Sequence, residues 1–360
     1  MIYLDYQATT PLAPESREAM LKHLDGPGGT GFGNPHSPHK LGRIAHAAVD
    51  VAREQVAALF PSGGQVIFTG GATEALNLAI RGSSGQGAVA FSAIEHSAVG
   101  DTAKSAGPAH VLGVGADGRC VADQDLPQDV RLIAVMQVNN EIGVIQASAE
   151  WVAKAREMGA LFLVDAVQAY GKLALAHADM IAVSAHKFHG PKGIGALWVR
   201  DGVKLVEQQT GGGQEAGLRS GTLSPALIAG FGAAAAMAGV RMEEDAAHVE
   251  ALWNRAREHF AGWTLNGSAE HRWHGNMNIR KNGLDVARLM SDCRNIMFSA
   301  GSACASGSGR PSNVLKAIGL TDADAKSSIR LGWGRYTTVE QVDEAAKTIL
   351  AAAKEQELWG

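Results

Sequence analysis

Short apolar runs alternate with amphipathic stretches along the first two thirds of the chain. Apolar positions recur at helical spacing from Leu41 to Leu59 and predict a helix over residues 40–60. The stretches TEALNLAI and SAEWVAKAREMG are typical of further helices. Short apolar runs typical of buried strands occur at residues 65–70, 88–93, 132–138, 161–166, 180–185 and 195–199. This alternation predicts an α/β fold, with a mostly parallel sheet wrapped by helices and with ligands at the strand ends.

The pattern changes near residue 245, and this change predicts a second, smaller domain. The elements expected there are a helix as far as residue 260, a short strand near 276–279, a loop of small residues at 299–309 and a final helix at 339–357. We therefore expect a large domain at residues 15–244 and a small α/β domain formed by residues 1–14 and 245–360.

Composition and charge narrow the classes of function. Hydrophobic residues make up 46% of the 360 residues and charged residues 19%, as in ordinary folded proteins. The net charge of -4 gives no bulk positive potential of the kind that attracts nucleic acids, so we expect no direct nucleic-acid binding. The first residues lack the features of a signal peptide, and no segment reaches the roughly 20 apolar residues of a membrane span. We expect a cytoplasmic protein that acts on small molecules.

The three cysteines, Cys120, Cys293 and Cys304, are too few and too scattered for a disulfide framework. No pair has the close spacing of a zinc knuckle, so we expect no metal site, and a reducing compartment is favoured. Cys304 differs from the other two because it lies in GSACASGSG, a run too small and polar to pack as core. The run predicts an exposed, mobile loop that carries a reactive thiol, whereas Cys120 and Cys293 are expected to be buried.

Residues 113–118, GVGADG, match the GxGxxG string of dinucleotide-binding folds. A dinucleotide site needs a helix to begin at these glycines, but the polar stretch that follows has no helical periodicity. We therefore reject a nicotinamide site here.

A better anion site lies at TGGATE, residues 69–74, where an apolar run passes through glycines into a predicted helix. Free N–H groups at the helix start, around Ala72 and Thr73, could hold one phosphate together with the Thr73 hydroxyl. The alternative is that Thr73 only caps a structural helix.

Polar side chains follow two other apolar runs. Asp165 ends the run LFLVD, and a buried carboxylate there needs a cationic partner, such as a protonated ring nitrogen, with Gln168 free to bond an adjacent ring oxygen. The alternative is that Asp165 caps the next helix. Lys187 follows the run MIAV, where a desolvated lysine could condense with an aldehyde, and it is flanked by Ser184 and His186 as possible phosphate donors.

Two further strand ends carry groups that suit a flat ring. His96 could stack on such a ring and move protons, although a histidine there can also be structural. The side-chain amides of Asn139 and Asn140, which precede Glu141, could bond a ring oxygen or a substrate carboxylate, with loop capping as the alternative.

Segments along nearly the whole chain resemble, in order, those of cysteine desulfurases of the IscS and NifS type. They are YLDYQATTP, GNPHSPHKLGR, TGGATEALNLAI, EHSAV, VNNEIGVIQ, DAVQ, SAHKFHGPKGIGAL, GGGQE, RSGT, GSACASGS and SSIRLGWGRYTT. The resemblance implies the aspartate aminotransferase fold, which is fold type I of the enzymes that use pyridoxal 5'-phosphate (PLP), in a homodimer with active sites at the subunit boundary. The chain departs from the family at Ala216, where arginine is usual.

The resemblance also implies roles for single residues. For the cofactor ring these are Lys187 bonded to the aldehyde, His96 stacked on the ring, Asp165 at the pyridine nitrogen and Gln168 at the phenolic oxygen. The implied phosphate ligands are Ala72, Thr73, Ser184 and His186, with Thr222 from the other subunit. Asn140, which also borders the cofactor, and Arg330 would hold the substrate carboxylate.

The implied reaction begins when L-cysteine replaces Lys187 on the cofactor and Lys187 takes the Cα proton. The Cys304 thiolate then attacks the substrate sulfur and keeps it as a persulfide, and alanine leaves. The implied acceptor is an iron-sulfur scaffold or a sulfurtransferase protein, with tRNA thiolation as a further use. The alternatives are a selenocysteine lyase or a related PLP aminotransferase and, from another class, a catalytically silent dimeric partner protein.

Overall fold

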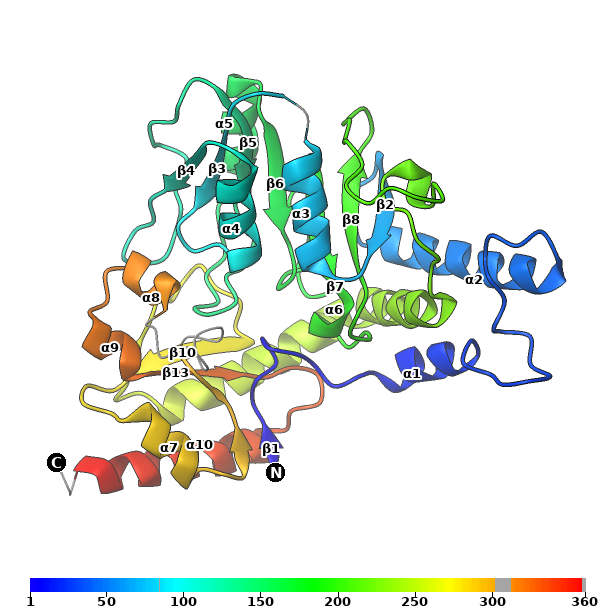
Figure 1. The fold of residues 1–360 in the computed structure, drawn as a ribbon. Helices are drawn as coiled ribbons and strands as arrows, with labels where there is room; N and C mark the ends of the chain where they lie inside the picture. Colours follow the sequence, from blue (N-terminus) through cyan, green and yellow to red (C-terminus); the bar gives the residue numbers. More distant parts are fainter. Residues whose placement is uncertain (84, 302–311, 358–360) are drawn as a thin grey trace.

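The computed structural model describes residues 1–83, 85–301 and 312–357. A seven-stranded sheet forms its centre (Figure 1). In spatial order its strands are β2 (Gly64–Thr69), β8 (Gly195–Arg200), β7 (Met180–Ser184), β6 (Leu161–Asp165), β5 (Val130–Ala134), β3 (Ala88–Ser92) and β4 (Ala109–Leu112). Within this sheet only β8 runs antiparallel to its neighbours, β2 and β7. The predicted α/β fold with a mostly parallel sheet is confirmed.

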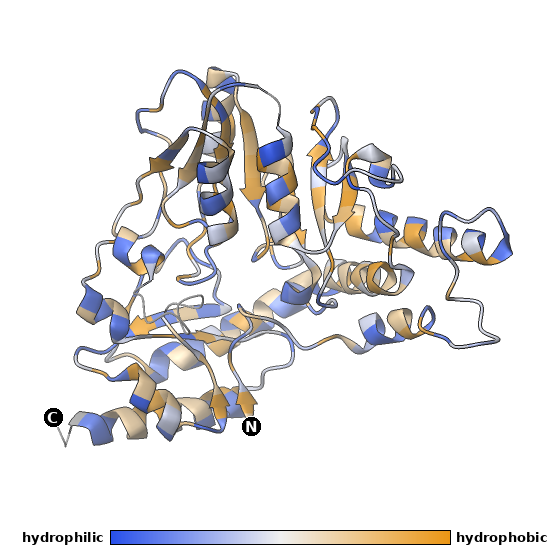
Figure 2. Ribbon diagram, viewed as in Figure 1, coloured by the Kyte–Doolittle hydropathy of each residue, from blue (hydrophilic) through white to orange (hydrophobic). Residues whose placement is uncertain are grey.

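Helices cover both faces of this sheet because successive strand residues point to opposite sides. In β6, Leu163 packs with α3 (Ala72–Gly82) and α4 (Ser97–Ala106), whereas Val164 packs in the cluster that includes α2 (Lys40–Ala57), α5 (Ser148–Met158) and α6 (Pro225–His259). Figure 2 shows the result as apolar strands enclosed by helices of mixed hydropathy. Both faces are buried, which explains why the strands read as continuous apolar runs.

A smaller sheet follows in the order β12 (Ser299–Ala300), β13 (Ser328–Gly332), β10 (Asn276–Arg280) and β9 (Thr264–Leu265). Near it lie α7 (Val286–Asp292), α8 (Asn313–Ala317), α9 (Asp322–Lys326) and α10 (Val339–Glu357) (Figure 1). The first strand, β1 (Ile2–Tyr3), pairs with β11 (Ile296–Met297), and α1 (Pro14–Leu21) packs on α6. The N-terminal segment therefore pairs through β1 with a strand from the C-terminal part of the chain and packs through α1 on the long helix α6.

Several sequence predictions need correction. The helix expected to begin near 245 is the second half of α6, so the predicted division at 244/245 falls inside one continuous helix. The strand expected at residues 132–138 ends earlier, because β5 stops at Ala134. Beyond it, the main-chain N–H groups of Val135 and Gln137 still donate hydrogen bonds to the β6 carbonyls of Leu163 and Asp165. Strands β4 and β13 were not predicted from the sequence. The division of the chain into two domains stays a prediction.

The expectation that no segment is apolar enough to cross a membrane also needs correction. By length and composition alone, α6 is such a segment. Within the protein 44% of this apolar stretch is buried, where Ile228 and Phe231 belong to the main core and the helix contacts α1, α2 and α10. This packing accounts for part of its apolar composition.

Candidate active site

A cavity of about 1030 Å³ opens at the carboxyl ends of the parallel strands. Strands β2, β6 and β7 end at it, because Gly70, Asp165 and Ser184 all line it. Its lining includes Ala72, Thr73, His96, Asn140, Gln168, His186, Lys187 and Arg330. These residues come from segments far apart in the sequence, and the cavity brings together every predicted site residue except Asn139, Thr222 and Cys304. Thr222 is exposed and does not line the cavity, and Cys304 lies outside the described residues.

One end of the cavity is built to receive an anion. Helix α3 begins there with Gly71 as its N-cap, at φ 151°, and no side chain caps its first N–H groups. A Cβ atom placed on Gly71 would lie 4.0 Å from the Ser184 hydroxyl oxygen, so that hydroxyl faces the same spot. Thr73 lies inside the helix, and the alternative that it caps the helix is therefore wrong.

His186 borders the same end and is held by the N-terminal segment. Its Nδ1 lies 3.1 Å from the Thr9 hydroxyl oxygen, and its main-chain carbonyl accepts a hydrogen bond from Thr10 N–H at 2.9 Å. Burial, followed by the charges of Lys187, Lys192 and Lys172, lowers the pKa of His186 to about 4. The ring is therefore neutral at neutral pH and can donate a hydrogen bond without carrying charge.

Asp165 lies deep in the cavity, at the end of β6. Burial raises the pKa of its carboxyl, while a hydrogen bond from Val167 N–H and the charges of His96 and Lys187 lower it. Its Oδ1 accepts the Val167 N–H at 2.9 Å within a turn, and no helix begins there, so the capping alternative is wrong. A cation placed against this carboxylate would offset its desolvation.

His96 has a structural role that does not conflict with a chemical one. It is the N-cap of α4, and its Nδ1 accepts the Ala98 N–H at 3.1 Å. Because Nδ1 accepts, the neutral ring carries its proton on Nε2. Both interpretations of this histidine can therefore hold at once.

Lys187 closes a short turn after β7, at Ala185–Lys187. Its Nζ donates to the main-chain carbonyls of Gln7 at 2.6 Å and Ala8 at 2.9 Å. Gln168 Nε2 also donates to the Gln7 carbonyl, at 3.0 Å. The N-terminal segment thus forms one wall of the site, a feature that the sequence reasoning missed.

Lys172 is a second residue that the sequence reasoning missed. Its Nζ lies 3.5 Å from Gln168 Oε1. Burial and then the charge of Lys187 lower the pKa of Lys172 to about 7. No sequence pattern indicated this contact, because residues 167–172 form a turn and not a helix, so a spacing of four residues does not by itself bring side chains together.

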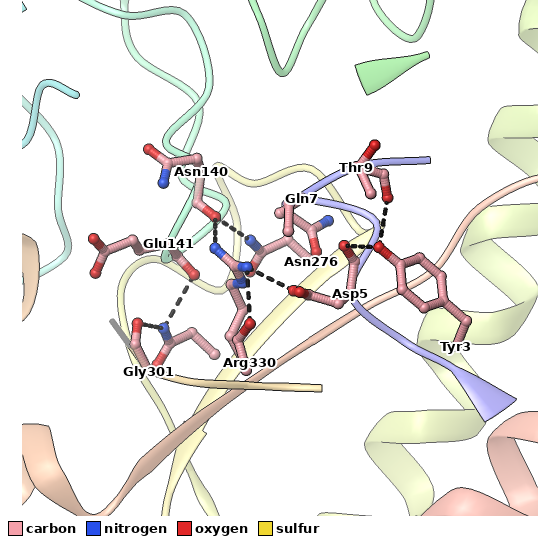
Figure 3. Close-up of polar contacts among 12 residues, drawn as sticks. Tyr3, Asp5, Gln7, Thr9, Asn140, Glu141, Asn276, Gly301 and Arg330 are labelled. Carbon is pink, nitrogen blue, oxygen red and sulfur yellow. Dashed lines mark hydrogen bonds and ion pairs between the residues drawn. The ribbon is translucent and has the colours of Figure 1, made fainter. Parts of the chain in front are cut away.

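Arg330, on β13, also lines the cavity, and its side chain is fully buried. It donates to the Asn140 carbonyl at 3.0 Å and to Asp5 Oδ1 at 2.6 Å (Figure 3). Asn139 caps the loop, since its Oδ1 accepts the N–H groups of Glu141 and Ile142. Of the two asparagines, Asn140 is the one that lines the cavity.

Cys120 and Cys293 are buried, as expected. Burial raises the pKa of both thiols, to about 12 for Cys120, so neither forms a thiolate readily at neutral pH. Among the described residues no group of three or more His, Cys, Asp or Glu side chains could hold a metal ion.

The residues around the cavity fit PLP. An uncapped helix start with a nearby hydroxyl suits its phosphate, and a buried carboxylate suits its protonated ring nitrogen. Lys187 supplies a primary amine to the same cavity.

Comparisons with known proteins agree with this geometry. The model of the aminotransferase class-V family matches residues 2–345. The cysteine desulfurase IscS of Shewanella denitrificans is 41% identical over 97% of this chain and 91% of its own length. The mitochondrial cysteine desulfurase of Saccharomyces cerevisiae is 40% identical over 97% of this chain and 74% of its own length.

Two solved structures are also similar to this chain. A NifS-like protein superposes with a TM-score of 0.88 at 29% identity, covering 97% of this chain and 98% of that one. The protein SspA, solved in complex with cysteine, superposes with a TM-score of 0.81 at 34% identity, covering 94% of this chain and 100% of that one.

Proposed function

This chain belongs to the cysteine desulfurase family of the class V aminotransferases, and we propose that it transfers sulfur from L-cysteine to Cys304 as a persulfide and releases L-alanine. The observation that most supports the proposal is that Lys187, Asp165, His96 and Arg330 line one cavity with an anion-binding helix start. The enzyme uses PLP, as the family does.

The residues that we propose to bind PLP and the substrate fall into three sets, for the phosphate, for the ring and for the substrate carboxylate. Ala72, Thr73, Ser184 and His186 would hold the phosphate, with Thr222 contributed by the second subunit of a homodimer. His96 would stack on the ring, Asp165 would pair with the ring nitrogen, and Gln168 would bond the phenolic oxygen. Arg330 and Asn140 hold the substrate carboxylate, for which a guanidinium is suited because it can donate two parallel hydrogen bonds.

When bound, PLP supplies an aldehyde that condenses with an amine and a ring that takes up the electrons of the broken Cα–H bond. Lys187 Nζ removes the Cα proton and later returns a proton to the product. His96, with its proton on Nε2, is placed to manage the proton of the substrate thiol.

The Cys304 thiolate attacks the substrate sulfur, so that an S–S bond forms while the C–S bond breaks. The electron pair of the broken bond returns to carbon, which takes up a proton to give alanine. The persulfide then passes its sulfur to an acceptor, an iron-sulfur scaffold or a sulfurtransferase protein, and tRNA thiolation is a further use. We place this chemistry in the cytoplasm.

The test follows alanine and sulfide released from L-cysteine in the presence of PLP and a thiol reductant. Wild type should give both in equal amounts. Cys304→Ser should lose sulfide release by at least about 100-fold while keeping the cofactor absorbance, because only the nucleophile is removed. Lys187→Ala should lose both products by about 10²- to 10⁴-fold, because proton transfer at Cα fails.

Sulfide release that is unchanged in Cys304→Ser would contradict the proposal and favour a selenocysteine lyase or an aminotransferase. A wild-type protein that takes up no PLP and shows no cofactor absorbance would support the silent partner protein instead.

A further inference from the structure

The loop that follows β5 contacts both the cavity and the chain on either side of residues 302–311. Asn140 lines the cavity, and its main-chain carbonyl accepts a hydrogen bond from Arg330. The next residue, Glu141, directs its carboxylate away from Arg330 (Figure 3). Two neighbouring residues thus face two different parts of the molecule.

The Glu141 carboxylate meets the chain after residue 311. The Ser312 hydroxyl donates a short hydrogen bond to Glu141 Oε2. The same hydroxyl oxygen accepts the Leu315 N–H at 3.0 Å, since Ser312 is the N-cap of α8. Both residues are buried, at 7% and 4% exposed, so water cannot easily replace this bond.

The Glu141 main chain meets the chain before residue 302. Asn278 on β10 is fully buried, and its Nδ2 donates to the carbonyls of Glu141 at 3.0 Å and Gly301 at 3.2 Å. Gly301 N–H donates to the Ser328 carbonyl at 2.7 Å. A Cβ atom on Gly301 would lie only 2.7 Å from Ser328 Cβ, so only glycine fits this approach.

The segments on both sides of residues 302–311 are therefore linked to Glu141, which follows Asn140: Ser312 directly, through the carboxylate, and Gly301 indirectly, through Asn278 and the Glu141 main-chain carbonyl. Cys304 follows Gly301 by three residues, and three residues of extended chain span at most about 11 Å. Gly301 and Ser312 are the described residues nearest to Cys304 on its two sides in the sequence.

We propose that Glu141 is a positioning residue for the sulfur-transfer step, because it fixes Ser312 and, with Asn278, Gly301 against the substrate-binding side of the cavity. This inference rests on the proposed function. It assigns Glu141 no contact with cofactor or substrate, so the steps that need only Lys187 should not depend on it.

The test compares Glu141→Ala and Ser312→Ala with wild type and with Glu150→Ala, a control that removes an exposed glutamate on α5. All are used as the full chain loaded with PLP. The first readout is exchange of the Cα hydrogen of L-alanine with D₂O, which needs Lys187 but not Cys304. The second is the single-turnover rate of persulfide formation on Cys304 with L-cysteine, measured by alkylation and mass spectrometry.

We expect both variants to keep alanine exchange within about 2-fold of wild type and to form persulfide at least about 10-fold more slowly. Ser312→Thr keeps a hydroxyl at the N-cap and should restore the rate. If Glu141→Ala fails to fold, the comparison of Ser312→Ala with Ser312→Thr still tests the proposal.

Unchanged persulfide formation in Ser312→Ala would overturn the inference. So would a parallel fall of both readouts, because the contact would then act on the whole cavity. If wild type and Glu150→Ala themselves form no persulfide while exchanging alanine, the proposed function fails instead.

Discussion

At the scale of single residues, the positive charge of Arg330 is paired with the carboxylate of Asp5 before any substrate enters. Its guanidinium is fully buried and lies 2.6 Å from the Asp5 carboxylate, which is itself 19% exposed. A second carboxylate, from a substrate, must share Arg330 with Asp5 and is repelled by it. Asp5 therefore limits how tightly an amino acid can bind, and it does so from a segment about 325 residues away in the chain.

We expect Asp5→Asn to tighten the binding of L-alanine by about 3- to 10-fold, because the amide still accepts a hydrogen bond but no longer repels the carboxylate. The midpoint of thermal unfolding should fall, since a buried guanidinium loses its counter-charge. Titration followed by cofactor absorbance measures the affinity. L-Alaninamide, which lacks the carboxylate, is the matched control and should bind the variant and wild type alike. Weaker binding of L-alanine to the variant would contradict this account.

At the scale of elements, the short turn Glu215–Gly217 contains two non-glycine residues in the left-handed region, Glu215 at φ 49° and Ala216 at φ 56°. The strain at Glu215 is compensated, because its buried carboxylate accepts two hydrogen bonds from Arg53, at 2.8 and 2.6 Å, and one from Phe68 N–H at 2.6 Å. Ala216 is exposed, and its methyl group has no comparable contact.

Ala216→Gly should therefore raise the free energy of unfolding by about 0.5–1 kcal/mol, because glycine adopts positive φ without steric cost. Urea denaturation measures the change. Ala153→Gly, at an exposed position within α5, should lower the same quantity by about 1 kcal/mol. Equal losses in both variants would show that Ala216 is not strained.

The elements also show what a sequence can predict. Asp165 and Ser184 could be recognised because each ends an apolar run, and a parallel sheet brings such strand ends to one edge. The hydrogen-bond partners of Lys187 could not be predicted, because they are the main-chain carbonyls of Gln7 and Ala8. Every residue has such a carbonyl, so residue type does not indicate which ones accept a bond. The reversed direction of β8 left no signal either, since a strand buried on both faces reads the same in both directions.

At the scale of the whole molecule, the half-buried His186 and the buried His189 join the N-terminal segment to the chain that follows β7. His189 Nδ1 donates to the Pro11 carbonyl at 2.9 Å, and His189 N–H donates to the Thr10 hydroxyl at 2.7 Å. Burial lowers the pKa of His189 from 6.5 to about 4, although its bond to Pro11 opposes this. As the pH falls from about 6.5 to 4, the unfolded chain binds a proton at this residue that the folded chain does not, so stability is lost in that window.

His189→Asn should remove this pH dependence, because asparagine keeps a side-chain N–H and tolerates the positive φ of 74° at this position. Buried carboxyls with raised pKa, such as Asp165, act in the opposite direction, so the difference between variant and wild type is the quantity to follow. At about 1.4 kcal/mol per pKa unit, the variant should gain about 3 kcal/mol on wild type between pH 7 and pH 4, as measured by urea denaturation. A constant difference across this range would show that His189 titrates normally.

The path of the N-terminal segment also sets an order of events during synthesis. Ile2 pairs with Ile296, and Asp5 forms a bridge with Gly332, so these two residues have no strand partner until residues 296–332 have been made. Gln7 and Ala8, which accept the hydrogen bonds of Lys187, lie just beyond these pairings. The large sheet can form while translation continues, but the strand pairings that anchor the segment before Gln7 and Ala8 form only after residues 296–332 have emerged.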